Sequence, residues 1–140
     1  MKDYSVVDTT GNSAKYSPVT ILTDDATLTA YNSYGIVGIA TDAKTISLPA
    51  ITSNMLGVEF TIMNTGADGN NIVTISPAAT DSINGTIANA AADSVAGGVV
   101  NKNIVNTKAT ANKGDYIKIK AVALTEWYIV GGVGIWASEG

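Results

Sequence analysis

The 140-residue sequence contains no cysteine, histidine, arginine or glutamine. The absence of cysteine excludes disulfide bonds and thiolate chemistry. The absence of both histidine and cysteine excludes Ser-His-Asp and Cys-His catalytic sets and the usual zinc ligands. All eight cationic side chains are lysines and the formal net charge is −4. Nucleic acid is therefore not an expected partner, because phosphate recognition favours arginine forks and basic patches.

Long hydrophobic runs are also missing. No stretch of 18 apolar residues occurs, so we expect neither a membrane-spanning helix nor a membrane partner. The first 18 residues lack the apolar core of 7–15 residues that defines a secretory signal. The sequence therefore predicts a soluble chain that is synthesised in the cytoplasm.

Hydrophobic residues make up 46% of the chain and charged residues only 14%. Threonine, asparagine and serine must supply most of the polar surface, a composition typical of strands and turns. A single domain of this length buries roughly two thirds of its surface on folding, which is enough for a core without disulfides or metals. Global disorder is excluded at this hydrophobic content.

Short segments that alternate apolar and polar residues recur along the chain, separated by Gly, Asn and Asp. The predicted strands are 18–22, 27–31, 34–41, 44–48, 58–64, 71–76, 82–87, 115–123, 126–130 and 134–138. We expect nine to eleven strands, which predicts an all-β fold: a single-domain antiparallel β-sandwich or jelly-roll-like barrel over residues 18–140. No strict repeat of 20–50 residues is visible, so a solenoid is not expected.

Two pairs of these strands are predicted to form hairpins. Strands 58–64 and 71–76 flank TGADGN, whose Gly and Asp-Gly residues suit a hairpin loop. Strands 115–123 and 126–130 are joined by two residues only. In strand 115–123, Ile117, Ile119 and Ala121 are predicted to face the core, and Tyr116, Lys118 and Lys120 to face outward. In strand 58–64, Val58, Phe60 and Ile62 share one face, and Glu59, Thr61 and Met63 share the other.

The segment 88–96, ANAAADSVA, is left with two interpretations. Its alanine content suits a short helix ended by Gly97 and Gly98. A long excursion loop fits the same residues equally well.

Residues 1–17 are polar and aperiodic, and they predict an extended N-terminal arm. A frayed terminus is the ordinary interpretation of such a segment. Four apolar side chains, Tyr4, Val6, Val7 and Tyr16, favour instead an arm that orders against a neighbouring subunit or lattice. These four residues are the candidates for attachment to a capsid or to another subunit.

The remaining candidate sites are few, and we expect no catalytic residue, metal or cofactor. GADGNN (66–71) offers oxygen ligands but lacks the D-x-D-x-D frame and distal Glu of a calcium loop. Trp127 and Trp136 could form a stacking platform for a glycan, which makes a glycan the alternative ligand. The competing interpretation, which we favour, places both rings in the core or at a subunit seam.

Several of these segments occur together in a recognisable order. KTISLPA is followed by the predicted hairpin with NTGADG, then by VTISP, DSINGT, NTKATANKGDY and GIWASE. Over about residues 28–140 this order resembles a module of tailed-bacteriophage virion proteins, found in head decoration, head-fibre and some tail-fibre proteins.

The resemblance implies a structural protein on the virion surface, made in the host cytoplasm and commonly homotrimeric, whose partner is the major capsid protein. A single short domain without a collagen-like or coiled-coil shaft favours capsid decoration or cementing over a tail fibre. The alternative is the host-recognition or carbohydrate-binding head of a phage fibre. Neither function requires an enzyme.

Overall fold

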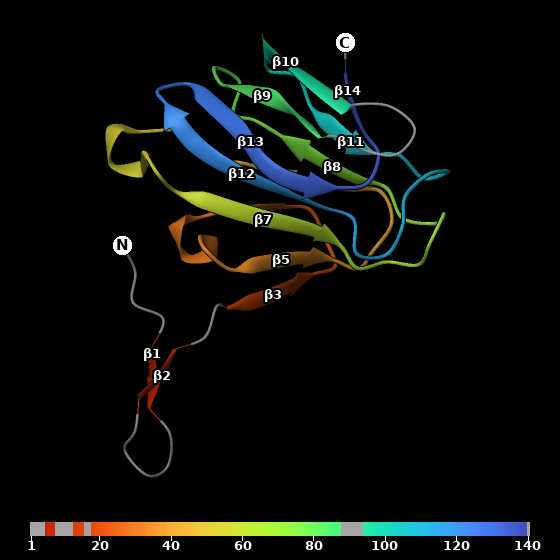
Figure 1. The fold of residues 1–140 in the computed structure, drawn as a ribbon, viewed down its shortest axis with the longest axis horizontal. Coiled ribbons are helices and arrows are strands. Elements are labelled where there is room, and N and C mark those ends of the chain that lie inside the picture. Colours follow the sequence, from red (N-terminus) through yellow and green to blue (C-terminus); the bar gives the residue numbers. More distant parts are fainter. Residues whose placement is uncertain (1–4, 8–12, 16–17, 88–93, 140) are drawn as a thin grey trace.

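The computed structural model describes residues 5–7, 13–15, 18–87 and 94–139 (Figure 1). These residues are built almost entirely from β-strands, and two sheets pack against each other around one hydrophobic core. The predicted all-β sandwich is therefore confirmed.

The larger sheet has seven strands among the described residues. In spatial order they are β10 (Ser94–Val100), β9 (Ser82–Ile87), β13 (Glu126–Val133), β12 (Tyr116–Ala123), β7 (Glu59–Asn64), β5 (Ile36–Ile39) and β3 (Val19–Leu22). The smaller sheet has five, in the order β14 (Trp136–Ser138), β11 (Ile104–Asn106), β8 (Val73–Ser76), β6 (Lys44–Ser47) and β4 (Ala26–Thr27).

Strands β3 to β8 alternate between the two sheets. In the larger sheet β3, β5 and β7 lie side by side and parallel, with Ile36 aligned to Val19 and Thr61. In the smaller sheet β4, β6 and β8 are likewise parallel, with Ile46 aligned to Ala26 and Ile75. The chain therefore winds around the core as a short coil. The turns of this coil differ in length, which explains why no sequence repeat marks them.

The later strands pair mostly antiparallel, and β12 and β13 form the predicted hairpin. Both sheets are consequently mixed, and the prediction of an antiparallel, jelly-roll-like arrangement is wrong in strand direction. Alternation along a strand shows which side chains face inward, but it carries no information on which neighbour the strand joins or in which direction.

The predicted hairpin of 58–64 with 71–76 is also wrong. Strand β7 pairs with β5 and β12, whereas β8 pairs with β6 and β11 in the other sheet. The connection 65–70 crosses from one sheet to the other. Gly and Asp-Gly residues provide the tight backbone path that such a crossing requires just as they do in a hairpin.

Two further segments differ from expectation. In place of a strand over 27–31, β4 ends at Thr27 and a 3-10 turn, η1 (Ala30–Asn32), follows, capped by the Thr29 hydroxyl, which accepts from the Tyr31 amide at 3.3 Å. Of the segment 88–96, residues 88–93 lie outside the described part of the chain. Its last three residues begin strand β10, because pairing with β9 overrides the helix propensity of alanine.

The second helical segment is the 3-10 turn η2 (Ser53–Met55). No helix among the described residues is long and apolar enough to cross a membrane.

The core is formed by the inward faces of both sheets. Phe60, Ile62, Ile117 and Ile119 are fully buried. The predicted inward face of β12 is therefore confirmed, and the face that Phe60 and Ile62 were predicted to share in β7 is the inward one. Facing them from the smaller sheet are the buried side chains of Ile46, Val73, Ile75 and Ile104.

The two short strands of the arm, β1 (Ser5–Val7) and β2 (Ser13–Lys15), pair antiparallel in a separate two-stranded ladder. Figure 1 shows this ladder apart from both sheets, near the start of β3.

Candidate functional site

The predicted attachment residues belong to the arm. Val6 and Val7 lie in β1, aligned with Ala14 and Ser13 of β2. Tyr4 and Tyr16 lie outside the described residues. The predicted extended arm therefore contains a backbone ladder of its own.

Both tryptophans lie in the core. Trp127 is 0% exposed and Trp136 is 1% exposed. The Trp127 ring lies 5.5 Å from the ring of Phe60, and the Trp136 indole donates to the Val133 carbonyl at 3.2 Å. Neither ring is available to stack on a sugar, so a glycan platform built on them is not present in this fold.

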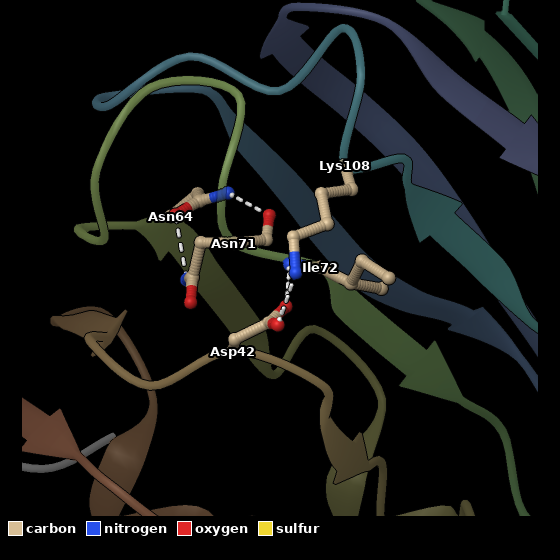
Figure 2. Close-up of polar contacts among 5 residues, drawn as sticks. All are labelled: Asp42, Asn64, Asn71, Ile72 and Lys108. Carbon is tan, nitrogen blue, oxygen red and sulfur yellow. Dashed lines mark hydrogen bonds and ion pairs between the residues drawn. The ribbon is translucent and has the colours of Figure 1, made fainter.

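A buried network of amides closes one end of the sandwich. Asn71 Nδ2 donates to Asn64 Oδ1 at 2.8 Å, and Asn64 Nδ2 donates to the Asn71 carbonyl at 2.9 Å (Figure 2). Asn64 Nδ2 also donates to Asn106 Oδ1, whose own amide donates to Asp115 Oδ2 at 3.1 Å. All four side chains are at least 96% buried. Because their polar atoms bind one another, this cluster fastens the loops of both sheets together and is structural.

Asp42 joins the same end from the surface. Its carboxylate accepts from Lys108 Nζ at 2.6 Å and from the Ile72 amide at 2.8 Å (Figure 2). The hydrogen bond from Lys108, followed by that from the Ile72 amide, lowers the pKa of Asp42 below its usual 3.8. The charged form of this carboxylate is therefore the one that holds the two connections in place.

The segment 66–71 also lies at this end. Asn71 is committed to the amide network, and Asp68 Oδ1 accepts from the Lys113 amide. Among the described residues, no group of three or more acidic side chains is placed to hold a metal ion. The segment serves as an intersheet connection that its own polar side chains brace.

A hollow lies on the outer face of the larger sheet, over β5, β7 and β12. This outer-face groove has a volume of about 400 Å³ and lies between strands that Figure 1 shows side by side. Its main lining residues are Tyr34, Glu59, Thr61, Met63, Tyr116 and Lys118. Aromatic, apolar and charged side chains thus meet in one concave surface, as in many small-ligand sites.

Tyr34, one of the residues that line the outer-face groove, has an unusual backbone conformation. Its φ of 60° is left-handed, which is rare for a bulky residue. Its amide donates to the Glu59 carbonyl at 2.8 Å, and its hydroxyl donates to the Gly57 carbonyl. Hydrogen bonds therefore hold Tyr34 both at its backbone amide and at its hydroxyl group. The same residue also lines a second hollow of about 500 Å³.

A different kind of surface lies at the edge of the same sheet. Among the described residues, strand β3 pairs only with β5, so its other side is an open edge in this part of the chain. Val19 and Ile21 lie on this edge strand with 64% and 53% of their surface exposed. We call this side of β3, with Val19 and Ile21, the attachment edge. It lies where the N-terminal arm ends, because the arm joins the sheet through Pro18.

Sequence reasoning did not find the outer-face groove. Alternation correctly placed Thr61 and Met63 on one face of β7, and Tyr116 and Lys118 on the outer face of β12. The missing information was that β12 lies beside β7, in register from Tyr116 to Lys120. The sequence also gives no sign that Tyr34 has a left-handed backbone conformation, because tyrosine rarely adopts a positive φ.

Comparisons with known proteins leave the chain without an assigned family. No protein-family model matches it, and no curated protein matches it.

Proposed function

We propose that this chain is a structural protein of a bacteriophage virion that decorates or cements the capsid as a homotrimer held through its N-terminal arm and the base of its domain. The motif order described above supports a virion surface protein.

The observation that carries the proposal is the attachment edge. Monomeric proteins usually protect an open strand edge with charge, proline or a covering loop, because an exposed apolar edge invites pairing with other chains. Here β3 presents Val19 and Ile21 to solvent and has no charged residue within its four positions. Contact with a second subunit or with the coat protein would cover this edge.

The mechanism follows from this arrangement. The arm and the base of the domain bind across the junction of neighbouring coat subunits, self-association of three copies covers the attachment edge, and the sandwich remains outside the shell. Since the decorating protein binds only assembled coat, it stabilises the shell by mass action on the assembled state.

A non-enzymatic role fits the buried acids. Asp81 Oδ2 accepts from the Ile51 amide at 3.0 Å, and Asp115 Oδ2 accepts from the Asn112 amide at 2.9 Å. Each carboxylate thus braces a turn of the backbone, which is a common structural use of buried acids.

Capsid occupancy tests this proposal. Capsids of the encoding phage that lack the protein are mixed with the full chain or with a chain that begins at Pro18, and bound protein is measured after sedimentation. We expect the full chain to co-sediment and the truncated chain, still folded by circular dichroism, to remain in the supernatant. Failure of the full chain to bind, or equal binding of both chains, contradicts attachment through the arm.

A further inference from the structure

The outer-face groove combines features that the decoration role does not use. It lies on the face of the larger sheet, between strands β5, β7 and β12, whereas the attachment edge belongs to β3. Its volume of about 400 Å³ is within the range of sites for small ligands.

The polar groups of the outer-face groove are available to a ligand. Within the described part of the chain, the side chains of Thr61, Tyr116 and Lys118 form no hydrogen bond or ion pair. Lys120, two residues further along the same strand face, instead lies 3.8 Å from Glu59. That contact partly neutralises the Glu59 carboxylate and leaves Lys118 as the unpaired charge of the groove.

Tyr34 supplies independent support for a binding role. A left-handed conformation of a non-glycine residue costs of order 1–3 kcal/mol and persists only where the surrounding structure imposes it. Here hydrogen bonds to the Glu59 and Gly57 carbonyls hold the residue in place. The effect is to hold an aromatic residue, 38% exposed, in the lining of the groove.

We propose that the outer-face groove binds a saccharide that carries a carboxylate. The Tyr34 and Tyr116 rings provide apolar surfaces for a sugar ring, with Thr61 and Glu59 as partners for its hydroxyl groups. The Lys118 ammonium binds the sugar carboxylate through a charge-assisted hydrogen bond.

The chemistry of the groove selects this ligand over others. A purely apolar ligand would cover Lys118 and the Tyr116 hydroxyl without satisfying them, which is unfavourable. A polyanion would meet a protein of net charge −4 and a groove with one unpaired cation. A small ligand with many hydroxyl groups and a single negative charge provides hydrogen-bond partners for the polar side chains and matches the one unpaired cation.

A matched pair of sugars provides the test. Methyl β-D-glucuronide and methyl β-D-glucoside differ in whether the sugar carries a carboxylate or a hydroxymethyl group. Each is titrated into the ¹⁵N-labelled full chain, and amide shifts are followed by NMR. We expect saturable shifts at Thr61, Met63 and Lys118 with the glucuronide, and binding about tenfold weaker with the glucoside.

Two variants separate the roles of the side chains. Lys118→Met should reduce glucuronide affinity about tenfold and leave glucoside affinity unchanged. Tyr34→Gly should weaken binding of both sugars while keeping the fold, because glycine adopts a φ of 60° without strain. Lys102→Met, at an exposed lysine outside the groove, is the control and should bind both sugars as the unaltered chain does.

Equal affinity for the two sugars would overturn the proposal, as would glucuronide binding that survives Lys118→Met. Shifts confined to residues outside the groove, or no saturable shift at all, would overturn it too. The sugar titrations and the capsid co-sedimentation are independent measurements, so the saccharide proposal can fail while the proposal of capsid binding stands, and the reverse.

Discussion

Asn64 and Asn71 bind each other across the crossing between the two sheets. Asn71 Nδ2 donates to Asn64 Oδ1 at 2.8 Å, and Asn64 Nδ2 returns a bond to the Asn71 carbonyl at 2.9 Å. Asn64 ends β7 in the larger sheet, while Asn71 lies two residues before β8 in the smaller one. The pair therefore joins the two layers at the point where the chain passes between them.

Removal of the Asn64 amide should destabilise the protein substantially. Asn64→Ala eliminates four side-chain hydrogen bonds and deprives the buried Asn106 Oδ1 and Asn71 carbonyl of a donor. We expect a loss of about 3 kcal/mol in the free energy of unfolding, measured by urea denaturation. Asn70→Ala, at an exposed position of the same connection, is the control and should cost less than about 0.5 kcal/mol. Similar losses for both variants would show that the network does not hold the crossing.

The ion pair of Asp42 predicts a dependence of stability on pH. Lys108 and the Ile72 amide lower the pKa of Asp42 in the folded state, so its contribution is present above the unfolded pKa and is lost as the pH falls through the folded value. The contribution is small, because both side chains are partly exposed. Asp42→Asn should therefore be less stable than the unaltered chain at pH 7, and the difference should shrink as the pH falls below 3.8, the usual pKa of this group. A difference that stays constant over this range would contradict the assignment.

Gly85 should resist substitution for two reasons. Its φ of 122° disfavours any side chain, and an added Cβ would lie 3.0 Å from the Ile129 Cβ and 3.2 Å from the Ile129 backbone. Gly114 has a φ of 99° but nothing within 4 Å of an added Cβ, so it isolates the backbone effect. We expect Gly114→Ala to cost about 1 kcal/mol and Gly85→Ala at least about 2 kcal/mol, by thermal or urea unfolding. Equal costs would mean that β9 can move away from β13 freely.

The sequence predicted which segments form strands far better than it predicted which strands pair with each other. Ile117, Ile119 and Ala121 were assigned to the core from alternation, and all three are fully buried. Burial of one strand face is a local property, so it leaves a local signal. The hairpin predicted for 58–64 and 71–76 failed because the choice of partner depends on the whole sheet.

The outer-face groove could not be predicted from the sequence for the same reason, because strand pairing brings its residues together. Tyr116 and Lys118 were correctly placed on an outer face, but their proximity to Glu59 and Thr61 results from the pairing of β12 with β7. The left-handed Tyr34 arises from bonds to residues 57 and 59, more than twenty positions away. Trp127 and Trp136, which did attract attention in the sequence, lie in the core.

The central claim is that this protein assembles through its attachment edge, and the mass of the particle in solution tests it most directly. Size-exclusion chromatography with light scattering should give three times the mass of one chain for the full sequence. Ile21→Lys should shift the mass to that of a monomer, because a charge at the edge opposes pairing. Val122→Lys, at a side chain of equal 53% exposure on β12, should remain a trimer. A monomeric full chain, or a trimer that survives Ile21→Lys, would contradict the account.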